Sequence, residues 1–76
     1  MEIHSNKYRQ LSLNISHYRK KTGLSQMQLA EKIGISRTHL SQIEAPNIIR
    51  AFSINVLFDI ADTLEVETMK LFDFSK

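Results

Sequence analysis

The sequence predicts an all-α domain built from five short helices. Apolar residues recur at helical spacing in five separate segments, which is the primary signal for amphipathic helices. The chain also holds only two glycines and one proline, too few for the many turns of an all-β domain. Its 76 residues are enough for one small domain, and the absence of cysteine leaves helix packing or a partner, rather than disulfides, to stabilise it.

The first helix is predicted over about residues 7–22. Its apolar face consists of Tyr8, Leu11, Ile15 and Tyr18. Three basic residues at 19–21 suit a helix C-terminus, and Gly23 supplies the stop.

Two shorter helices follow. The second begins after the N-cap Ser25, whose spacing from Gln28 is that of a capping box, and it ends at Gly34 after about eight residues. The third begins after the N-cap Ser36 and ends before Pro46. The inward-facing residues of the two helices are Leu29, Ala30, Ile33, Leu40 and Ile43.

After a loop over residues 47–52, the last two predicted helices are strongly apolar. Ser53 caps the fourth, which is expected to be the core helix because apolar residues cover a wide arc of it: Ile54, Leu57, Phe58, Ile60, Ala61 and Leu64. The fifth is predicted over residues 66–74, with the apolar residues Met69, Leu71, Phe72 and Phe74. Met27 and Met69 are interpreted as packing residues.

Residues 25–44 predict a helix-turn-helix. Two short helices are joined by about three residues that include Gly34, and glycine permits the positive φ that a tight reversal needs. Ala30 is small where the two helices would cross. In this motif the second helix enters the major groove of DNA, so the pattern indicates a DNA-binding domain.

Charge is distributed unevenly along the chain. The net charge is +2, but residues 1–50 hold eight basic and three acidic residues, whereas residues 51–76 hold two basic and five acidic ones. The first part is therefore +5 and the second −3, which fits a polyanion bound on one side. On charge alone, a solvated surface without such a partner explains the distribution equally well.

One long run of residues has a specific spacing, Leu24-Ser25-Gln26-x-x-Leu29-Ala30-x-x-x-Gly34-Ile35-Ser36-x-x-x-Leu40-Ser41-x-Ile43-Glu44. With further matches up to Leu71-Phe72, it covers about residues 8–74. This pattern resembles the phage repressor/Cro-like (XRE-type) helix-turn-helix family, and the resemblance implies a lambda-repressor-like fold for a single domain over residues 1–76. The stretch 36–41 also resembles small control proteins of restriction–modification operons.

The third helix holds the residues expected to read bases. Arg37 lies in its first turn, and the arginine fork can pair bidentately with guanine O6 and N7. Thr38 can contact a thymine methyl or a phosphate. Gln42 lies about one turn further along the same face and can read adenine. A solvated surface cation is the alternative interpretation of Arg37.

Other polar residues are expected to contact the DNA backbone: Gln26, Ser36, His39, Ser41, Asn47 and Arg50. Gln26 resembles the family position that clamps a phosphate at a helix N-terminus. The resemblance also implies a structural ion pair between Arg19 and Glu44. The sequence departs from the family at two places where glycine is frequent. Ala45-Pro46 affects the path of the loop after the third helix, and Glu65 affects how the fourth helix ends.

Dimerisation is expected through residues 51–76. This part is acidic, which disfavours proximity to phosphates, so it should face away from DNA. Its interface residues are expected to be Phe52, Phe72 and Phe74, because aromatic residues are enriched at the buried centres of interfaces. Core packing within the monomer is the alternative, chiefly for Phe58.

The predicted function is sequence-specific binding of double-stranded DNA by a homodimeric transcriptional regulator, a repressor on a pseudo-palindromic operator. The alternative is an antitoxin or control-type module whose main partner is another protein. No nucleophile–base pair and no histidine pair at i, i+4 spacing is present, so no enzyme, metal or cofactor is expected. The longest apolar runs are three residues, so no membrane segment is expected, and the lack of cysteine fits the cytoplasm.

Overall fold

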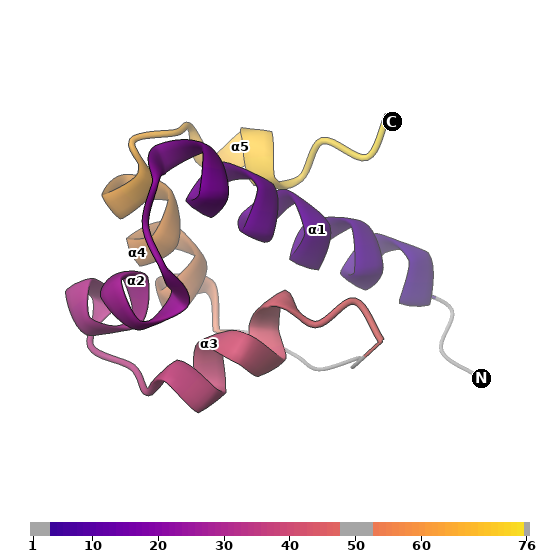
Figure 1. Ribbon diagram of the computed structural model, residues 1–76. Coiled ribbons are helices and arrows are strands. Elements are labelled where there is room, and N and C mark those ends of the chain that lie inside the picture. The colour runs from indigo at the N-terminus through magenta and orange to yellow at the C-terminus, as the bar shows by residue number, and fades with distance from the viewer. Residues whose placement is uncertain (1–3, 48–52, 76) are drawn as a thin grey trace.

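The computed structural model describes residues 4–47 and 53–75, which form five α-helices (Figure 1). These are α1 (Ser5–Thr22), α2 (Gln26–Ile33), α3 (Arg37–Glu44), α4 (Ile54–Leu64) and α5 (Thr68–Leu71). The prediction of an all-α, five-helix fold is confirmed, and the first four helices lie within about two residues of their predicted bounds. Within the described residues, no helix has the length and apolar character needed to cross a membrane.

A single core collects apolar side chains from all five helices. α1 packs against α3, α4 and α5, while α2 packs against α3 and α4. Figure 1 shows α1 running alongside α3, and the first turns of α1 lie near the segment that follows α5. The buried apolar residues are Leu11, Ile15, Leu29, Ala30, Leu40, Ile43, Leu57, Ile60, Ala61, Leu64 and Leu71.

The predicted fifth helix is too long. It was expected over residues 66–74, whereas α5 spans only Thr68–Leu71. The carbonyl groups of Leu71 and Asp73 accept hydrogen bonds from the side-chain amide of the buried Asn14, at 2.9 and 3.0 Å. The chain after α5 is therefore bonded to α1 instead of continuing a helix of its own.

Four apolar residues that the sequence analysis placed on the core helix or interpreted as packing residues are exposed. Ile54 and Phe58 are one turn apart on the solvent side of α4, and Met27 and Met69 are 57% and 70% exposed. The buried face of α4 consists of Leu57, Ile60, Ala61 and Leu64. The apolar arc of α4 is wider than the face that the described neighbours α1, α2 and α5 cover, so Ile54 and Phe58 stay on the surface.

α4 ends without the glycine that is frequent in the family. Glu65 adopts the left-handed conformation (φ 58°, ψ 41°), and the N–H groups of Glu65 and Val66 donate to the carbonyls of Asp62 and Ala61. Gly23 ends α1 with the same geometry. The sequence departure at Glu65 thus keeps the helix end intact, at a backbone strain that glycine would not carry.

Candidate nucleic-acid interface

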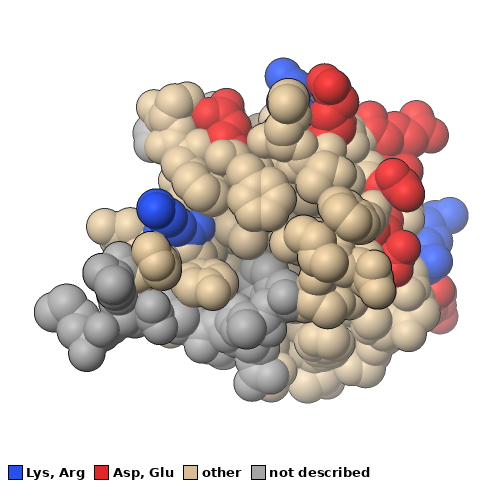
Figure 2. Space-filling model, turned by 180° about the vertical axis from the view of Figure 1, so that it is seen from behind, with Lys and Arg blue, Asp and Glu red and all other residues tan. Residues whose placement is uncertain are grey.

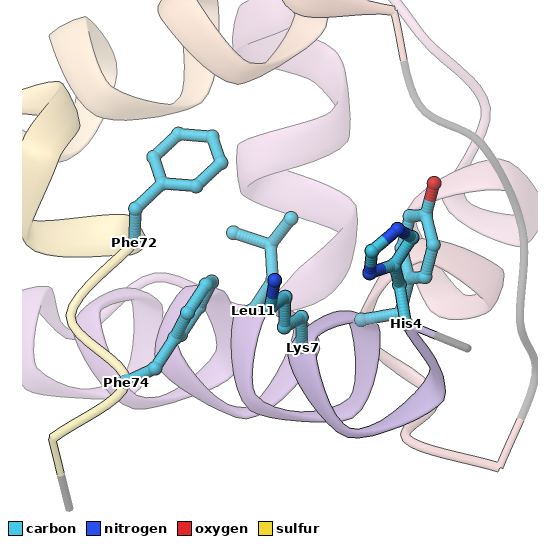
Figure 3. A pocket seen from close by; sticks show the side chains of 6 residues that line it. His4, Lys7, Leu11, Phe72 and Phe74 are labelled. Carbon is cyan, nitrogen blue, oxygen red and sulfur yellow. The ribbon is translucent and has the colours of Figure 1, made fainter.

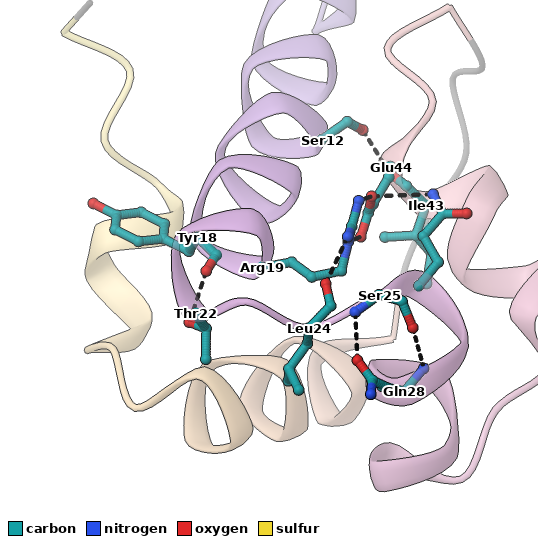
Figure 4. Close-up of polar contacts among 10 residues, drawn as sticks. Ser12, Tyr18, Arg19, Thr22, Leu24, Ser25, Gln28, Ile43 and Glu44 are labelled. Carbon is teal, nitrogen blue, oxygen red and sulfur yellow. Dashed lines mark hydrogen bonds and ion pairs between the residues drawn. The ribbon is translucent and has the colours of Figure 1, made fainter.

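The helix-turn-helix consists of α2, α3 and the turn between them. At the start of α2, the Ser25 hydroxyl accepts from the Gln28 N–H at 3.0 Å and the Gln28 side-chain oxygen accepts from the Ser25 N–H at 2.8 Å, forming the capping box (Figure 4). At its end, Gly34 has a φ of 78°, and the N–H groups of Gly34 and Ile35 both donate to the Ala30 carbonyl. This turn sets the direction in which α3 leaves α2.

α3 has one face in the core and one face open to solvent. Leu40 and Ile43 are fully buried. At about 100° per residue, positions 37, 38, 41 and 42 fall within an arc of about 140° on the other side of the helix. The structure therefore brings the three residues expected to read bases onto one face, with Arg37 and Thr38 exposed and Gln42 half-buried.

Most residues expected at the DNA backbone lie around this face. The Ser36 hydroxyl accepts a hydrogen bond from the His39 N–H at 3.0 Å, which caps α3, and both residues are exposed. Ser41 is half-buried on α3, and Asn47 is exposed in the turn after it. Arg50, the last member of the predicted set, lies outside the described residues.

Arg19, Glu44 and Gln26 join three helices. Arg19 donates from Nε to Glu44 Oε2 at 2.7 Å and from Nη2 to Glu44 Oε1 at 2.9 Å, with only 10% and 4% of the two side chains exposed (Figure 4). Arg19 Nη1 also donates to the Leu24 carbonyl at 2.8 Å, and Gln26 Nε2 donates to Glu44 Oε1 at 3.2 Å. The ion pair implied by the resemblance thus ties α1 to the end of α3, and Gln26, expected at a phosphate, shares the same carboxylate.

Ser12 was missed by the sequence analysis. It is buried in α1, and its hydroxyl donates to the Ile43 carbonyl at 2.7 Å (Figure 4). Ile43 lies in the last turn of α3, where carbonyl groups lack helical partners. Because Ser12 lies one position after Leu11 and three before Ile15, its place on the apolar face of α1 is the signal that could have identified it.

The segment after α5 presents two exposed aromatic rings. Phe72 and Phe74 are 41% and 37% exposed, and their rings form an edge-to-face pair with centroids 6.2 Å apart. Figure 2, seen from the side opposite to Figure 1, shows a broad area without charged side chains and acidic side chains gathered along its edge. Phe52, the third residue expected at a dimer interface, lies outside the described residues.

Comparison with known proteins identifies the family. The helix-turn-helix family profile matches residues 15–71, most of the chain. The chain therefore belongs to the helix-turn-helix family, of the phage repressor/Cro-like (XRE) type that its motif residues resemble.

Three relatives illustrate this membership. The HTH-type transcriptional regulator SlrR of Bacillus subtilis (strain 168) is 43% identical over 56 residues, 74% of this chain, and the chain spans only 36% of the length of SlrR. The restriction–modification controller protein C.AhdI from Aeromonas hydrophila has a TM-score of 0.83 at 25% identity, covering 93% of this chain and 100% of C.AhdI. SinR of Bacillus subtilis, a master regulator for biofilm formation solved in complex with DNA, has a TM-score of 0.75 at 36% identity, covering 83% of this chain and 98% of that SinR chain. SinR has also been solved in a complex with the SinI protein.

Proposed function

We propose that this protein is a transcriptional regulator that binds double-stranded DNA sequence-specifically, with α3 in the major groove. The observation that carries the proposal is the arrangement of α3, which has its apolar residues in the core while Arg37, Thr38 and Gln42 share one outward face. These three side-chain types can read guanine, thymine and adenine, respectively. The complex of the similar SinR with DNA supports the same use of the motif here.

The charges around α3 support this proposal. Residues 1–50 carry a net charge of +5, which attracts a polyanion. The acidic residue of α3, Glu44, would repel phosphates, but its carboxylate is buried and neutralised by Arg19. Ser36, His39 and Asn47 are exposed around the reading face, where contacts to phosphates would set the register of the helix in the groove.

The test starts from a DNA sequence that the protein selects from a random pool. Fluorescence anisotropy then compares the affinity for the selected duplex with that for a random duplex of the same length. Arg37→Ala is expected to lose about 1–3 kcal/mol of discrimination between them, because a bidentate base contact is removed. Lys70→Ala removes one positive charge from α5 and serves as the control, which should leave the discrimination unchanged.

Two outcomes would contradict the proposal. Equal losses of affinity by Arg37→Ala on both duplexes would show that Arg37 contacts only the backbone. A wild-type protein that binds its selected duplex no more tightly than the random duplex would exclude sequence-specific recognition altogether.

We further propose that the regulator acts in the cytoplasm as a homodimer that represses transcription at a pseudo-palindromic operator. A helix of eight residues reads too few base pairs to define a unique site by itself. Residues 51–76 carry a net charge of −3, which favours a position away from phosphates, and the exposed Phe72 and Phe74 offer an apolar contact there. Two α3 helices related by a twofold axis would enter successive major grooves about 34–36 Å apart.

Sedimentation equilibrium tests the dimer. The wild type is expected to dimerise, whereas Phe72→Ser/Phe74→Ser is expected to stay folded and become monomeric, because the apolar contact is lost. Met27→Ser removes an exposed apolar side chain from α2 and is the control, expected to remain dimeric. If the folded double variant is still a dimer, the interface lies elsewhere, and a wild type that is monomeric with and without DNA would exclude the dimer.

The second candidate function is a module whose main partner is another protein, as in an antitoxin or a control protein. The exposed rings of Phe72 and Phe74 favour it, and the similar SinR has been solved with the SinI protein. Under this alternative, a protein should co-purify with the chain at fixed stoichiometry, and Phe72→Ser/Phe74→Ser should release it. A chain that purifies alone and still discriminates between the two duplexes would favour the DNA-binding function.

A further inference from the structure

A pocket of about 310 Å³ lies between the start of α1 and the segment that follows α5 (Figure 3). Its lining residues are His4, Lys7, Tyr8, Leu11, Phe72 and Phe74. The volume is at the lower end of the range of about 300–1,000 Å³ that is typical of small-molecule sites. The pocket shares no residue with the set expected to contact DNA, but it shares Phe72 and Phe74 with the proposed dimer interface, so a ligand there would compete with a second copy of the chain.

The pocket combines apolar walls with a cation. Lys7 is exposed, and in the described part of the chain its ammonium group has no ion-pair partner. Figure 3 shows the Lys7 nitrogen beside Leu11, with the two phenylalanine rings on one side and His4 on the other. No described acidic residue lines the pocket. In the segment that carries the two rings, the Asp73 Oδ1 accepts from the Ser75 N–H at 3.1 Å and from the Ser75 hydroxyl at 2.6 Å.

The aromatic wall of the pocket is held in place by hydrogen bonds from α1. The Asn14 side-chain amide donates to the Leu71 and Asp73 carbonyls, one on each side of Phe72, at 2.9 and 3.0 Å. The Asn14 side-chain oxygen in turn accepts from Gln10 Nε2 at 2.9 Å. Because the wall is fixed before any ligand arrives, binding requires little further ordering of the chain.

We propose that this pocket binds a small carboxylate with an aromatic or aliphatic body. The body would displace water from Leu11, Phe72 and Phe74, which is favourable in proportion to the apolar area covered. The carboxylate would pair with the Lys7 ammonium group. A cationic ligand would be repelled by Lys7, and a neutral one would gain only the apolar contact. This site goes beyond the proposed DNA-binding function and uses a different set of residues, but a ligand bound to Phe72 and Phe74 would oppose the proposed dimer.

The test uses 3-phenylpropionate as the probe and 3-phenylpropanol as its neutral counterpart with the same carbon skeleton. NMR titration of the full chain follows the amide signals of residues 7–11 and 72–74. We expect 3-phenylpropionate to shift these signals in a saturable way and to bind about threefold more tightly than the alcohol, a factor set by one exposed ion pair. Lys7→Gln should remove that preference, whereas Lys20→Gln, on the same helix but outside the pocket, should retain it. Phe74→Ala, checked for folding by circular dichroism, should weaken both probes about tenfold.

Three outcomes would overturn the proposal. If the wild type binds the acid and the alcohol equally tightly, the carboxylate group contributes nothing to binding, and the ligand is not selected for its negative charge. An absence of saturable shifts at millimolar probe would show that the pocket takes no such ligand. If the amide signals of the pocket residues shift with protein concentration alone and the probe does not reverse these shifts, the occupant of the pocket is a second copy of the chain. DNA affinity and sedimentation equilibrium are measured separately, so failure of the ligand site is distinguishable from failure of the proposed DNA binding and of the proposed dimer.

Discussion

α1 holds two regions of the molecule by chemically different contacts. Near its C-terminus, Arg19 binds the Glu44 side chain at the end of α3 through a bidentate ion pair. Nearer its middle, Asn14 binds the backbone carbonyls of Leu71 and Asp73 in and after α5 through neutral hydrogen bonds. The ion pair with α3, which stands beside the hydrogen bond from Ser12 to the Ile43 carbonyl, therefore needs a specific partner side chain, whereas the contact of Asn14 with the end of the chain needs only backbone groups in the right place.

This difference predicts unequal sensitivity to mutation. Loss of Arg19 would leave a charged carboxylate in a site where only 4% of the Glu44 side chain is exposed. Loss of Asn14 would leave carbonyl groups without donors but no uncompensated charge. Because an unpaired buried charge costs more than an unpaired buried carbonyl, the helix-turn-helix should be the more vulnerable region.

The largest effect is expected for Arg19→Met. It should lower the free energy of unfolding by about 3–5 kcal/mol, because Glu44 loses its counter-ion inside the protein. Urea denaturation followed by circular dichroism measures the change. Arg19→Met/Glu44→Leu removes both charges and should recover most of the loss. If the double variant is as unstable as the single one, the packing of the arginine stem, and not the buried charge, is what matters at this site.

A smaller effect is expected for Asn14→Leu. It should lower the free energy of unfolding by about 1–3 kcal/mol, because the buried hydrogen bond to the Leu71 carbonyl and the partly buried one to the Asp73 carbonyl are lost. Native-state hydrogen exchange should show faster exchange of the amides of residues 70–75 while those of α2 and α3 keep their protection. Gln10→Ala, which removes only the half-buried donor to Asn14, is the matched control and should have a weaker effect in the same direction. Uniform loss of protection across the chain would argue against two separately held regions.

The smallest effects are expected at two residues that end helices in the left-handed backbone conformation, Gly34 after α2 and Glu65 after α4. Glu65→Gly should raise the free energy of unfolding by about 0.5–1 kcal/mol, because glycine adopts a φ of 58° without strain. The greater backbone entropy that glycine loses on folding offsets only part of this stabilisation. Gly34→Ala should lower it by a similar amount, because an added Cβ meets no atom within 4 Å and only the φ of 78° is unfavourable. Glu65→Gln, which keeps the left-handed strain and removes the charge, should change little. Thermal unfolding resolves these differences, and a destabilised Glu65→Gly would show that the Glu65 side chain makes a stabilising contact.

Much of the candidate site was predictable because its signals are local. Ser25, Ser36 and Ser53 accept hydrogen bonds from backbone N–H groups three residues later, as N-caps do. Gly34 adopts the positive φ that the turn requires. The spacing of apolar residues on α3 is enough to place Arg37 on the outward face, because helical geometry links position to direction. The contacts of these outward residues with DNA stay predictions.

Other features depended on groups that are distant in the chain. The sequence analysis predicted a fifth helix to residue 74 because apolar residues continue to that point. α5 ends at Leu71, where the chain meets Asn14, 57 residues earlier. It also left core packing as the alternative for Phe58, but none of the described helices covers that side of α4, and Phe58 is 46% exposed.

By itself, the sequence determined the five helices, the N-caps, the turn at Gly34 and the family, because each depends on residues within a few positions of one another or on a fixed spacing along the chain. Only the tertiary structure decided which polar side chains of α1 are buried, where α5 ends, and which aromatic rings stay on the surface. Those outcomes depend on which backbone carbonyls and which helix faces meet after folding. The spacing of apolar residues indicates on which face of a helix a side chain lies, but it does not indicate which other element packs against that face.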